Sequence, residues 1–305
     1  MKKNIKKILV IMGFVLLLFN RNATMDSVYS ALNIWSKSIL PSLFPFFIFS
    51  DLFVSVGIAD ELSNKFGNLF GKIFKLSKYS FFIFIMSLIS GCPSNAKNIK
   101  NMMDSGYIMK SEAEKILSFT LFYNPFLIYT ITNLFLKNKD CIKLIIIIYI
   151  SNLLVGLIIR AKKARINNLI YKKNINMSLV DSIKNTIYSL INILGTIIFM
   201  MILVSLFKTD VPLINNIING LLEITSGIIS LKDINLSYNL KQILCLIYLS
   251  FGGLSIHMQI KSILKDTINY KLFYLARLLV VLISLGLFCI TQIYWIVISI
   301  RSSYW

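Results

Sequence analysis

Two short clusters of glycine, proline and polar residues interrupt apolar runs of the sequence, at residues 90–97 and 252–259. Glycine and proline end helices, and a helix that ends inside a bilayer leaves backbone N–H and C=O groups that only protein or a watery cavity can satisfy. Half-helices whose N-termini face such a cavity are suited to bind an anionic solute. The residues predicted to form this site are Gly91, Pro93, Asn95, Lys97, Gly252, Gly253, Ser255 and Gln259.

The alternative is that these residues only kink packed helices, and for either cluster alone that interpretation would be the better one. Residues 91–97 and 253–259, however, share a spacing of glycine, a proline or serine two positions later and a long polar side chain four positions after that. Each cluster also follows a short apolar run. The matching pair therefore favours a binding site over two unrelated kinks.

Besides Lys97, three further polar side chains stand near these clusters or inside apolar segments. Lys97 could pair with a substrate carboxylate, or its ammonium could reach lipid headgroups by snorkelling. Asp51 lies well inside an apolar segment, where a carboxyl group suggests ion coupling, proton transfer or the partner of a buried lysine. Thr120 and Asn124, next to Pro125, could face a solute, and hydrogen bonding between helices explains them equally well.

The sequence carries no sign of catalysis. No nucleophilic side chain stands beside a general base, and neither a phosphate-binding loop nor the ligand spacing of a metal site is present. The four cysteines form no CxxC pair, and the single histidine, His257, has no partner cluster. We therefore expect a protein that is not an enzyme, with no catalytic residue, no metal and no cofactor.

Composition places these residues in a membrane. Of the 305 residues, 56% are hydrophobic and 15% charged, and a span needs about 20 mostly apolar residues. The net charge of +19 comes from lysines and arginines that occur mainly in short loops between apolar runs, where they set topology and meet anionic headgroups. Nucleic acid is therefore not expected as a partner, and the basic residues at 160–184 are predicted to mark the cytoplasmic side.

We predict an all-α, polytopic bundle of about six spans with two re-entrant hairpins of broken helices. The first apolar segment, 8–19, is expected to stay uncleaved and is short for a span. The other predicted spans are 39–58, 116–136, 142–159, 186–207 and 272–301. Residues 59–78 are expected to form an interfacial helix and 211–231 an interfacial or buried segment. The predicted hairpins are 79–115 and 243–271.

The order of span, interfacial helix, hairpin and span occurs twice and begins on opposite sides of the membrane, so the two halves are predicted to be inverted repeats. This gives four regions of chain. They are an N-terminal membrane segment and linker (1–34), a first repeat (35–136), a linking span with the basic cytoplasmic loop (137–185) and a second, inverted repeat (186–305).

Four segments carry a resemblance to a known family: SGCPSNAK at 90–97, LSFTLFYNPFLI at 117–128, NGLLEITSGI at 219–228 and FGGLSIHMQIKSIL at 251–264. In these segments the sequence resembles the sporulation integral membrane protein family YlbJ, also called SpoVV. That family belongs to the nucleoside-recognition or Gate-domain proteins, which are related to concentrative nucleoside transporters. The likeness runs from about Trp35 to Phe288.

The resemblance implies a multi-pass protein of an endospore-forming Gram-positive bacterium, located in the outer forespore membrane, that transports dipicolinic acid toward the forespore. A dianionic aromatic solute would suit a site made of two half-helix ends with Lys97 nearby. The chain departs from the family pattern in this path. It has Cys92 and Asn95 where the family has an aromatic residue and a glycine, and Leu121, Phe122 and Tyr123 where the family has a polar stretch.

Taken together, residues and resemblance predict a transporter of a small organic anion, with dipicolinic acid as the first candidate. A nucleoside-type carrier of small solutes and a non-transporting membrane scaffold for spore cortex or envelope assembly are the alternatives. The expected partners are the lipid bilayer, the anionic solute and a coupling ion. An oligomer, or a complex with other sporulation membrane proteins, is left open.

Overall fold

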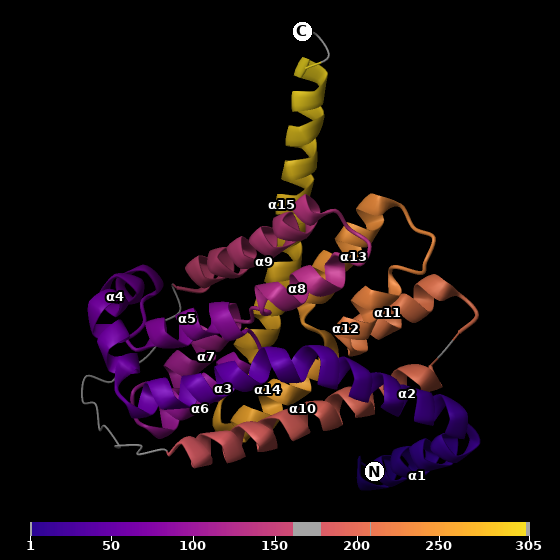
Figure 1. Cartoon of the computed structure of the whole chain (residues 1–305), viewed down its shortest axis with the longest axis horizontal. Helices are drawn as coiled ribbons and strands as arrows, with labels where there is room; N and C mark the ends of the chain where they lie inside the picture. Colours follow the sequence, from indigo (N-terminus) through magenta and orange to yellow (C-terminus); the bar gives the residue numbers. More distant parts are fainter. Residues whose placement is uncertain (1, 161–177, 208, 303–305) are drawn as a thin grey trace.

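A computed structural model of the chain describes residues 2–160, 178–207 and 209–302, and these are helical with no strand (Figure 1). Most of the predicted basic cytoplasmic loop, 160–184, lies outside these ranges. In chain order the helices are α1 (Lys2–Phe19), α2 (Arg21–Ile34), α3 (Leu40–Ser55), α4 (Ile58–Phe74), α5 (Ser80–Ser90), α6 (Ser94–Asp104), α7 (Lys110–Phe119), α8 (Pro125–Thr132), α9 (Asn138–Ile159), α10 (Leu179–Leu206), α11 (Pro212–Leu222), α12 (Ile224–Ser230), α13 (Tyr238–Phe251), α14 (Gly253–Leu264) and α15 (Lys271–Ser302). A π-helical turn at Trp35–Ile39 joins α2 to α3, and a 3₁₀ turn at Lys265–Thr267 follows α14.

Five segments in the described part of the chain are long and apolar enough to cross a membrane, instead of about six. They are Arg21–Ser55, Asn138–Ile159, Leu179–Leu206, Tyr238–Thr267 and Lys271–Ile293. The predicted crossing at 116–136 was wrong as a continuous helix, because α7 ends at Phe119 and α8 starts at Pro125. The first apolar segment forms α1 but is not among the five.

α5 and α6 form the first helical hairpin, where the sequence predicts one. Gly91 ends α5 with φ +76°, a conformation that favours glycine. The open end of the hairpin closes where the rings of Tyr79, before α5, and Tyr107, after α6, lie 4.8 Å apart. Burial raises the pKa of Tyr107 to about 12, so its hydroxyl remains a donor to Asp60 Oδ2, 2.9 Å away.

Residues 120–124, the gap that joins α7 to α8, run across the turn of this hairpin. The Cys92 N–H donates to the Phe122 carbonyl at 2.7 Å, and the Asn124 side-chain amide donates to the Ile89 carbonyl at 3.1 Å. A Cβ added to Gly91 would lie 2.3 Å from the Asn124 nitrogen, so only glycine allows this approach. Each interruption thus satisfies backbone groups that the other leaves free, as an apolar environment demands.

The second helical hairpin is α11–α12, and its turn is at Glu223. The Asn216 side-chain amide donates across it to the Gly227 carbonyl at 2.8 Å. The prediction of a second hairpin at 243–271 was therefore wrong. There, α13 and α14 follow one another as one broken helix that is interrupted at Gly252, with φ +98°. Gly252 and Gly253 both have positive φ, and they interrupt the helix without reversing the chain.

The two halves of the chain contain the same series of elements: a long helix, a hairpin, a broken helix and a second long helix. The contacts between the halves are reciprocal. The second arm of each hairpin contacts the second part of the other half's broken helix, α6 with α14 and α12 with α8, while α3 packs on α10 and α9 on α15. Such a pattern is expected of two repeats. Their inverted orientation across a bilayer stays a prediction.

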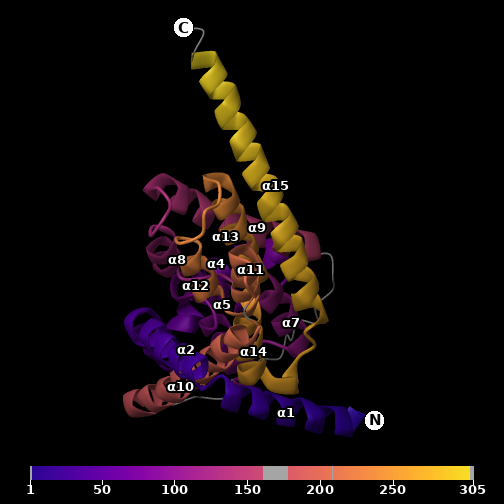
Figure 2. The ribbon, with the colours of Figure 1, turned by 90° about the vertical axis from the view of Figure 1, so that its right-hand side faces the viewer.

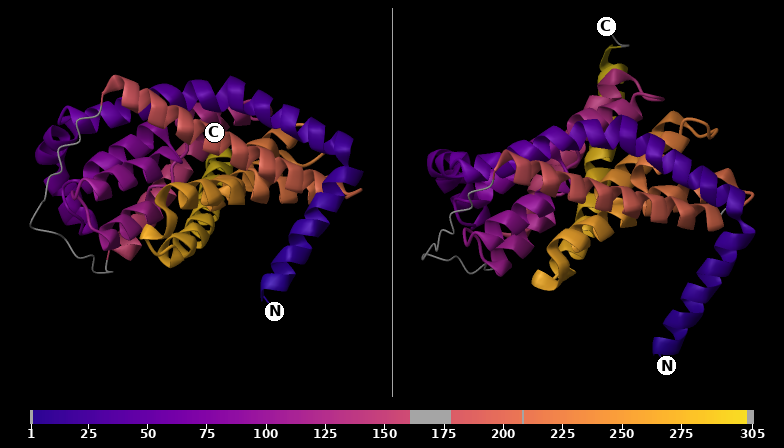
Figure 3. Two further views of the ribbon diagram at one scale, coloured as in Figure 1. Left: turned by 90° about the horizontal axis from the view of Figure 1, so that it is seen from below. Right: turned by 60° about the horizontal axis from the view of Figure 1, so that its bottom comes forward.

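Long helices frame the hairpins and broken helices. α2–α3 and α10 run side by side along one edge of the molecule, which is clearest from below (Figure 3). α15 stands at another edge and rises beyond the other helices (Figure 2). The interior between them is a continuous cluster of buried aliphatic and aromatic side chains, in which the rings of Phe74 and Phe119 stack with their centroids 4.9 Å apart.

Candidate functional site

A small cavity lies where the two hairpin turns and the two broken helices meet. Each hairpin turn lines it, as do both broken helices and the long helices α3 and α10. Its lining residues are Ile39, Ser42, Leu43, Cys92, Pro93, Tyr123, Asn124, Leu127, Ile193, Ile197, Glu223, Ile224, Thr225, Ile256 and Gln259. The cavity is thus mostly apolar with a few polar groups, as is typical of small-molecule sites.

The interruptions place the N-termini of α6 and α8 at this cavity and bring the first two turns of α14 to it, through Ile256 and Gln259. Pro93 directly precedes α6, Asn124 precedes α8, and α14 begins at Gly253. Each N-terminus carries roughly half a positive elementary charge from the helix dipole. Asn124 caps α8 with its side chain, whereas Pro93 and Gly252 supply no side-chain cap to α6 and α14. The electrostatic character of these ends favours an anion.

Three of the predicted site residues, Pro93, Asn124 and Gln259, line the cavity. Gln259 is 2% exposed, and its amide nitrogen donates to the Ser255 hydroxyl at 3.1 Å. Its Oε1 atom has no hydrogen-bond partner among the described residues. Ser255 therefore lies behind the site and orients Gln259, which keeps a polar atom available to a solute.

Other predicted site residues build the interruptions instead of lining the cavity. The Asn95 side chain donates to the Thr120 carbonyl at 3.0 Å and so joins the first hairpin to α7. Thr120 directs its own hydroxyl to the Ile116 carbonyl. Gly252 and Gly253 both have positive φ, and Gly253 packs against the turn of the second hairpin, where an added Cβ would lie 3.4 Å from the Ile224 nitrogen.

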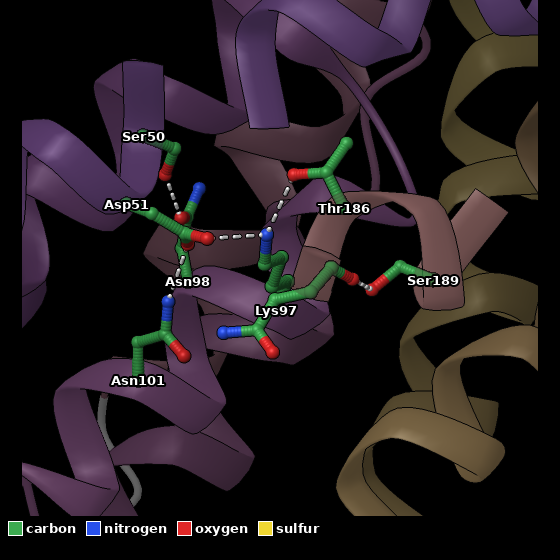
Figure 4. A network of polar contacts seen from close by, with 8 residues as sticks. Ser50, Asp51, Lys97, Asn98, Asn101, Thr186 and Ser189 are labelled. Atoms are coloured by element: carbon green, nitrogen blue, oxygen red, sulfur yellow. Dashed lines mark hydrogen bonds and ion pairs between the residues drawn. The ribbon is translucent and has the colours of Figure 1, made fainter. Parts of the chain in front are cut away.

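Lys97 is not part of the cavity lining; it forms a buried ion pair with Asp51 (Figure 4). The Lys97 ammonium lies 2.8 Å from Asp51 Oδ2, 3.5 Å from the Thr186 hydroxyl and 5.0 Å from the centroid of the Phe47 ring. The other Asp51 oxygen accepts a 3.0 Å hydrogen bond from Asn101. Of the roles considered for Asp51, the partner of a buried lysine is the one the structure contains, and Lys97 does not snorkel.

The main cavity residue that sequence reasoning missed is Glu223, which is 3% exposed. It was placed in a segment expected to be interfacial or buried. The structure puts it at a hairpin turn, where its carboxylate accepts a 2.7 Å hydrogen bond from the Ser226 N–H and caps α12. The available signal was an acidic residue within an apolar run, which marks function by default in a membrane. Tyr123, Cys92 and Thr225 were not proposed either.

Comparison with curated proteins finds a relative of the chain. No protein-family model and no solved structure matches the chain. The sporulation integral membrane protein YlbJ of Bacillus subtilis (strain 168) is 27% identical over 304 residues, which cover 84% of this chain and 74% of the relative. This similarity supports a YlbJ-family assignment. The described part of the chain also has five segments that are long and apolar enough to cross a membrane, in keeping with an integral membrane protein.

Proposed function

We propose that the chain is a multi-pass transporter that moves a small organic anion during endospore formation. Dipicolinic acid is the first candidate solute, and the outer forespore membrane is the proposed location. The relative's sporulation role and the resemblance to its family support the setting. The observation that carries the transport proposal is the cavity at which two hairpin turns and two broken helices meet, with uncapped helix N-termini beside it.

The chemical character of the cavity suits a small aromatic acid. In this structure the cavity has room for only a few water molecules, so its lining must move apart to admit a ring. Aliphatic side chains such as Ile193, Ile197 and Leu127 offer an apolar surface to a ring. The N-termini of α6 and α14 and the free Gln259 oxygen provide the polar ends, the helix ends being suited to carboxylates.

A crevice between α3 and α8 adjoins the cavity and is the proposed route into it. The crevice shares Ser42, Asn124 and Leu127 with the cavity. Lys37 lines the outer part of this crevice and is exposed. Because Lys37 belongs to the π-helical turn between α2 and α3, its ammonium lies midway along an apolar segment, where it can attract an anionic solute.

A deletion strain tests the proposal. Spores that form without the protein should contain little dipicolinate, and supplying dipicolinate in the medium should restore it. Purified protein in liposomes should take up labelled dipicolinate faster than protein-free liposomes, and imposed ion gradients would identify the coupling ion. Normal dipicolinate with a defective cortex would instead favour the membrane scaffold.

One observation favours the nucleoside-type carrier as the second candidate. Glu223 lines the cavity with a carboxylate, which accepts hydrogen bonds from sugar hydroxyls and repels an anion unless it is protonated. Competition against labelled dipicolinate by unlabelled nucleosides distinguishes the two candidates. Strong competition by a nucleoside would move the assignment to this second class.

A further inference from the structure

Arg277 in α15 is a buried cation that none of the preceding roles uses. It is 0% exposed and the largest of the fully buried side chains. One of its terminal nitrogens, Nη2, donates to the Ser118 carbonyl at 2.6 Å and to Asn152 Oδ1 at 3.0 Å. Arg277 therefore connects α15 to the end of α7 and to α9.

The positive charge of Arg277 has no countercharge among the residues that the structure describes. None of the ion pairs found among the described residues includes Arg277. Its Nε and Nη1 atoms have no hydrogen-bond partner there either. A buried charge without a partner is costly, and within a membrane segment it marks a solute or ion pathway.

The position of Arg277 relates this charge to the cavity. Ser118, which accepts from the Arg277 guanidinium, lies two residues before the gap between α7 and α8. Tyr123 and Asn124 in this gap line the cavity. The guanidinium is thus held beside the part of the broken helix α7–α8 that leads to the cavity.

A purely structural role does not require the charge. The Ser118 carbonyl and the Asn152 oxygen need only N–H donors, which a neutral amide also provides. By comparison, Lys97 has Asp51 as a direct partner. The end of the α7 dipole and the ring of Phe273, whose centroid lies 5.6 Å from Arg277 Cζ, compensate the charge only partly, so the guanidinium can still attract another anion.

We infer that Arg277 selects anionic solutes: its guanidinium is the countercharge for a carboxylate that enters the cavity beside the gap between α7 and α8. This inference rests on the proposed anion transport and names the residue that sets its charge preference. A small mono- or dicarboxylate is the class of solute that it fits. Arg277 would act on the solute from behind the cavity lining at rest and by direct contact when the lining opens.

The test compares two solutes of the same shape in liposomes that contain the full-length protein. Dipicolinate carries two carboxylates, and pyridine-2,6-dicarboxamide is its neutral counterpart. We expect Arg277→Gln to lower the ratio of dipicolinate to diamide uptake by about tenfold or more, as is typical when one partner of a buried charge pair is removed. Arg277→Lys keeps the charge and should keep the preference for dipicolinate.

Lys115→Gln is the matched control. Lys115, in α7, is a buried cation like Arg277. Its ammonium donates to the carbonyls of Lys75 and Arg160, and neither residue lines the cavity. Its uptake ratio should equal that of the wild type. A merely structural role for Arg277 would lower the uptake of both solutes equally and leave the ratio unchanged.

Two results overturn the inference and differ from failure of the proposed function. If wild-type protein takes up dipicolinate and Arg277→Gln shows the same ratio, Arg277 does not select the charge. If Arg277→Gln does not accumulate, Arg277→Lys decides, and loss of its preference for dipicolinate rejects the charge-based role. If wild-type protein takes up neither solute, the proposed transport itself fails and the inference with it.

Discussion

At the scale of single residues, the chain buries charges and treats them in two ways. Asp51 and Lys97 neutralise one another at 2.8 Å, so this pair adds no net charge near the cavity. Glu223 and Arg277 have no such direct partner among the described residues. Paired charges in apolar surroundings hold helices together. A buried charge without a countercharge lowers the stability of the fold, and in membrane segments such a charge is usually functional.

The buried pair leads to a prediction about stability. Lys97→Gln should destabilise the protein by about 3 kcal/mol, because it leaves the carboxylate of Asp51 buried without a countercharge. If Lys97 instead contacted the solute, the same substitution would weaken solute uptake without lowering the protein level. Thermal unfolding of the detergent-solubilised protein measures the difference.

The double variant Asp51→Asn/Lys97→Gln is the control for this prediction. It should lose less stability than the two single variants together, because its remaining side chains are neutral and can hydrogen-bond. Strictly additive losses would show that the two side chains are not coupled.

The carboxylate of Glu223 allows the two carrier candidates to be separated by binding. Glu223→Gln keeps an oxygen that can accept from the Ser226 N–H and cap α12, so the fold should be retained. Removing the negative charge should tighten binding of dipicolinate, measured by calorimetry on the purified protein, because the charge repels an anion. Weaker binding of dipicolinate and loss of nucleoside binding would instead indicate a nucleoside-type site.

At the scale of elements, each half of the site combines a hairpin with a broken helix. Close approach of backbones makes these units compact. A Cβ on Gly227 in α12 would lie 2.2 Å from the Gly220 Cα in α11, and Asn216 ties the same two helices together. At the base of the first hairpin, Glu112 accepts hydrogen bonds from the Ser77 N–H at 2.6 Å and the Ser80 hydroxyl at 2.7 Å.

The glycine contact in the second hairpin yields a prediction with an internal control. Gly227→Ala should destabilise the protein by about 1–3 kcal/mol, because the added methyl forces the hairpin arms apart. Gly195→Ala in α10 meets nothing within 4 Å and should stabilise the protein by up to about 1 kcal/mol through helix propensity. Thermal unfolding of both variants provides the measurement, and equal effects would mean that the α11–α12 contact is not tight.

At the scale of the whole molecule, the reciprocal contacts between the halves explain why one cavity serves both. α6 reaches α14 and α12 reaches α8, so residues from four interruptions meet although they are spread from 91 to 253 in the sequence. A shift of α3 and α10, which pack together along one edge, would change the access to all four at once. This is the type of rearrangement that alternating access requires.

The proposed inverted repeat can be tested by labelling. The open end of the first hairpin carries the exposed Asp104, and the chain after the second hairpin carries the exposed Lys232. In inverted repeats these ends lie on opposite sides of the membrane. In a background without the four native cysteines, Asp104→Cys and Lys232→Cys should therefore react with an impermeant maleimide from opposite sides. Labelling from the same side would exclude the inverted arrangement.

The sequence by itself determined the helical membrane class and the position of the first interruption. Both follow from local properties: the length of apolar runs, and the inability of proline and a left-handed glycine to continue a helix. The predicted residues Pro93, Asn124 and Gln259 do line the cavity. Sequence analysis can find residues near interruptions because the glycine and proline residues that end a helix stand at the interruption itself.

Only the tertiary structure decided which interruption reverses the chain and which charges are paired. Gly252 and Glu223 both end a helix, but the first continues along a broken helix and the second turns back. The difference depends on which helix faces pack against each other, and the local sequence around an interruption does not determine this. In the same way, Asp51 meets Lys97 across 46 positions of sequence, while Arg277 meets no acid in the described structure, because pairing of buried charges is set by helix packing.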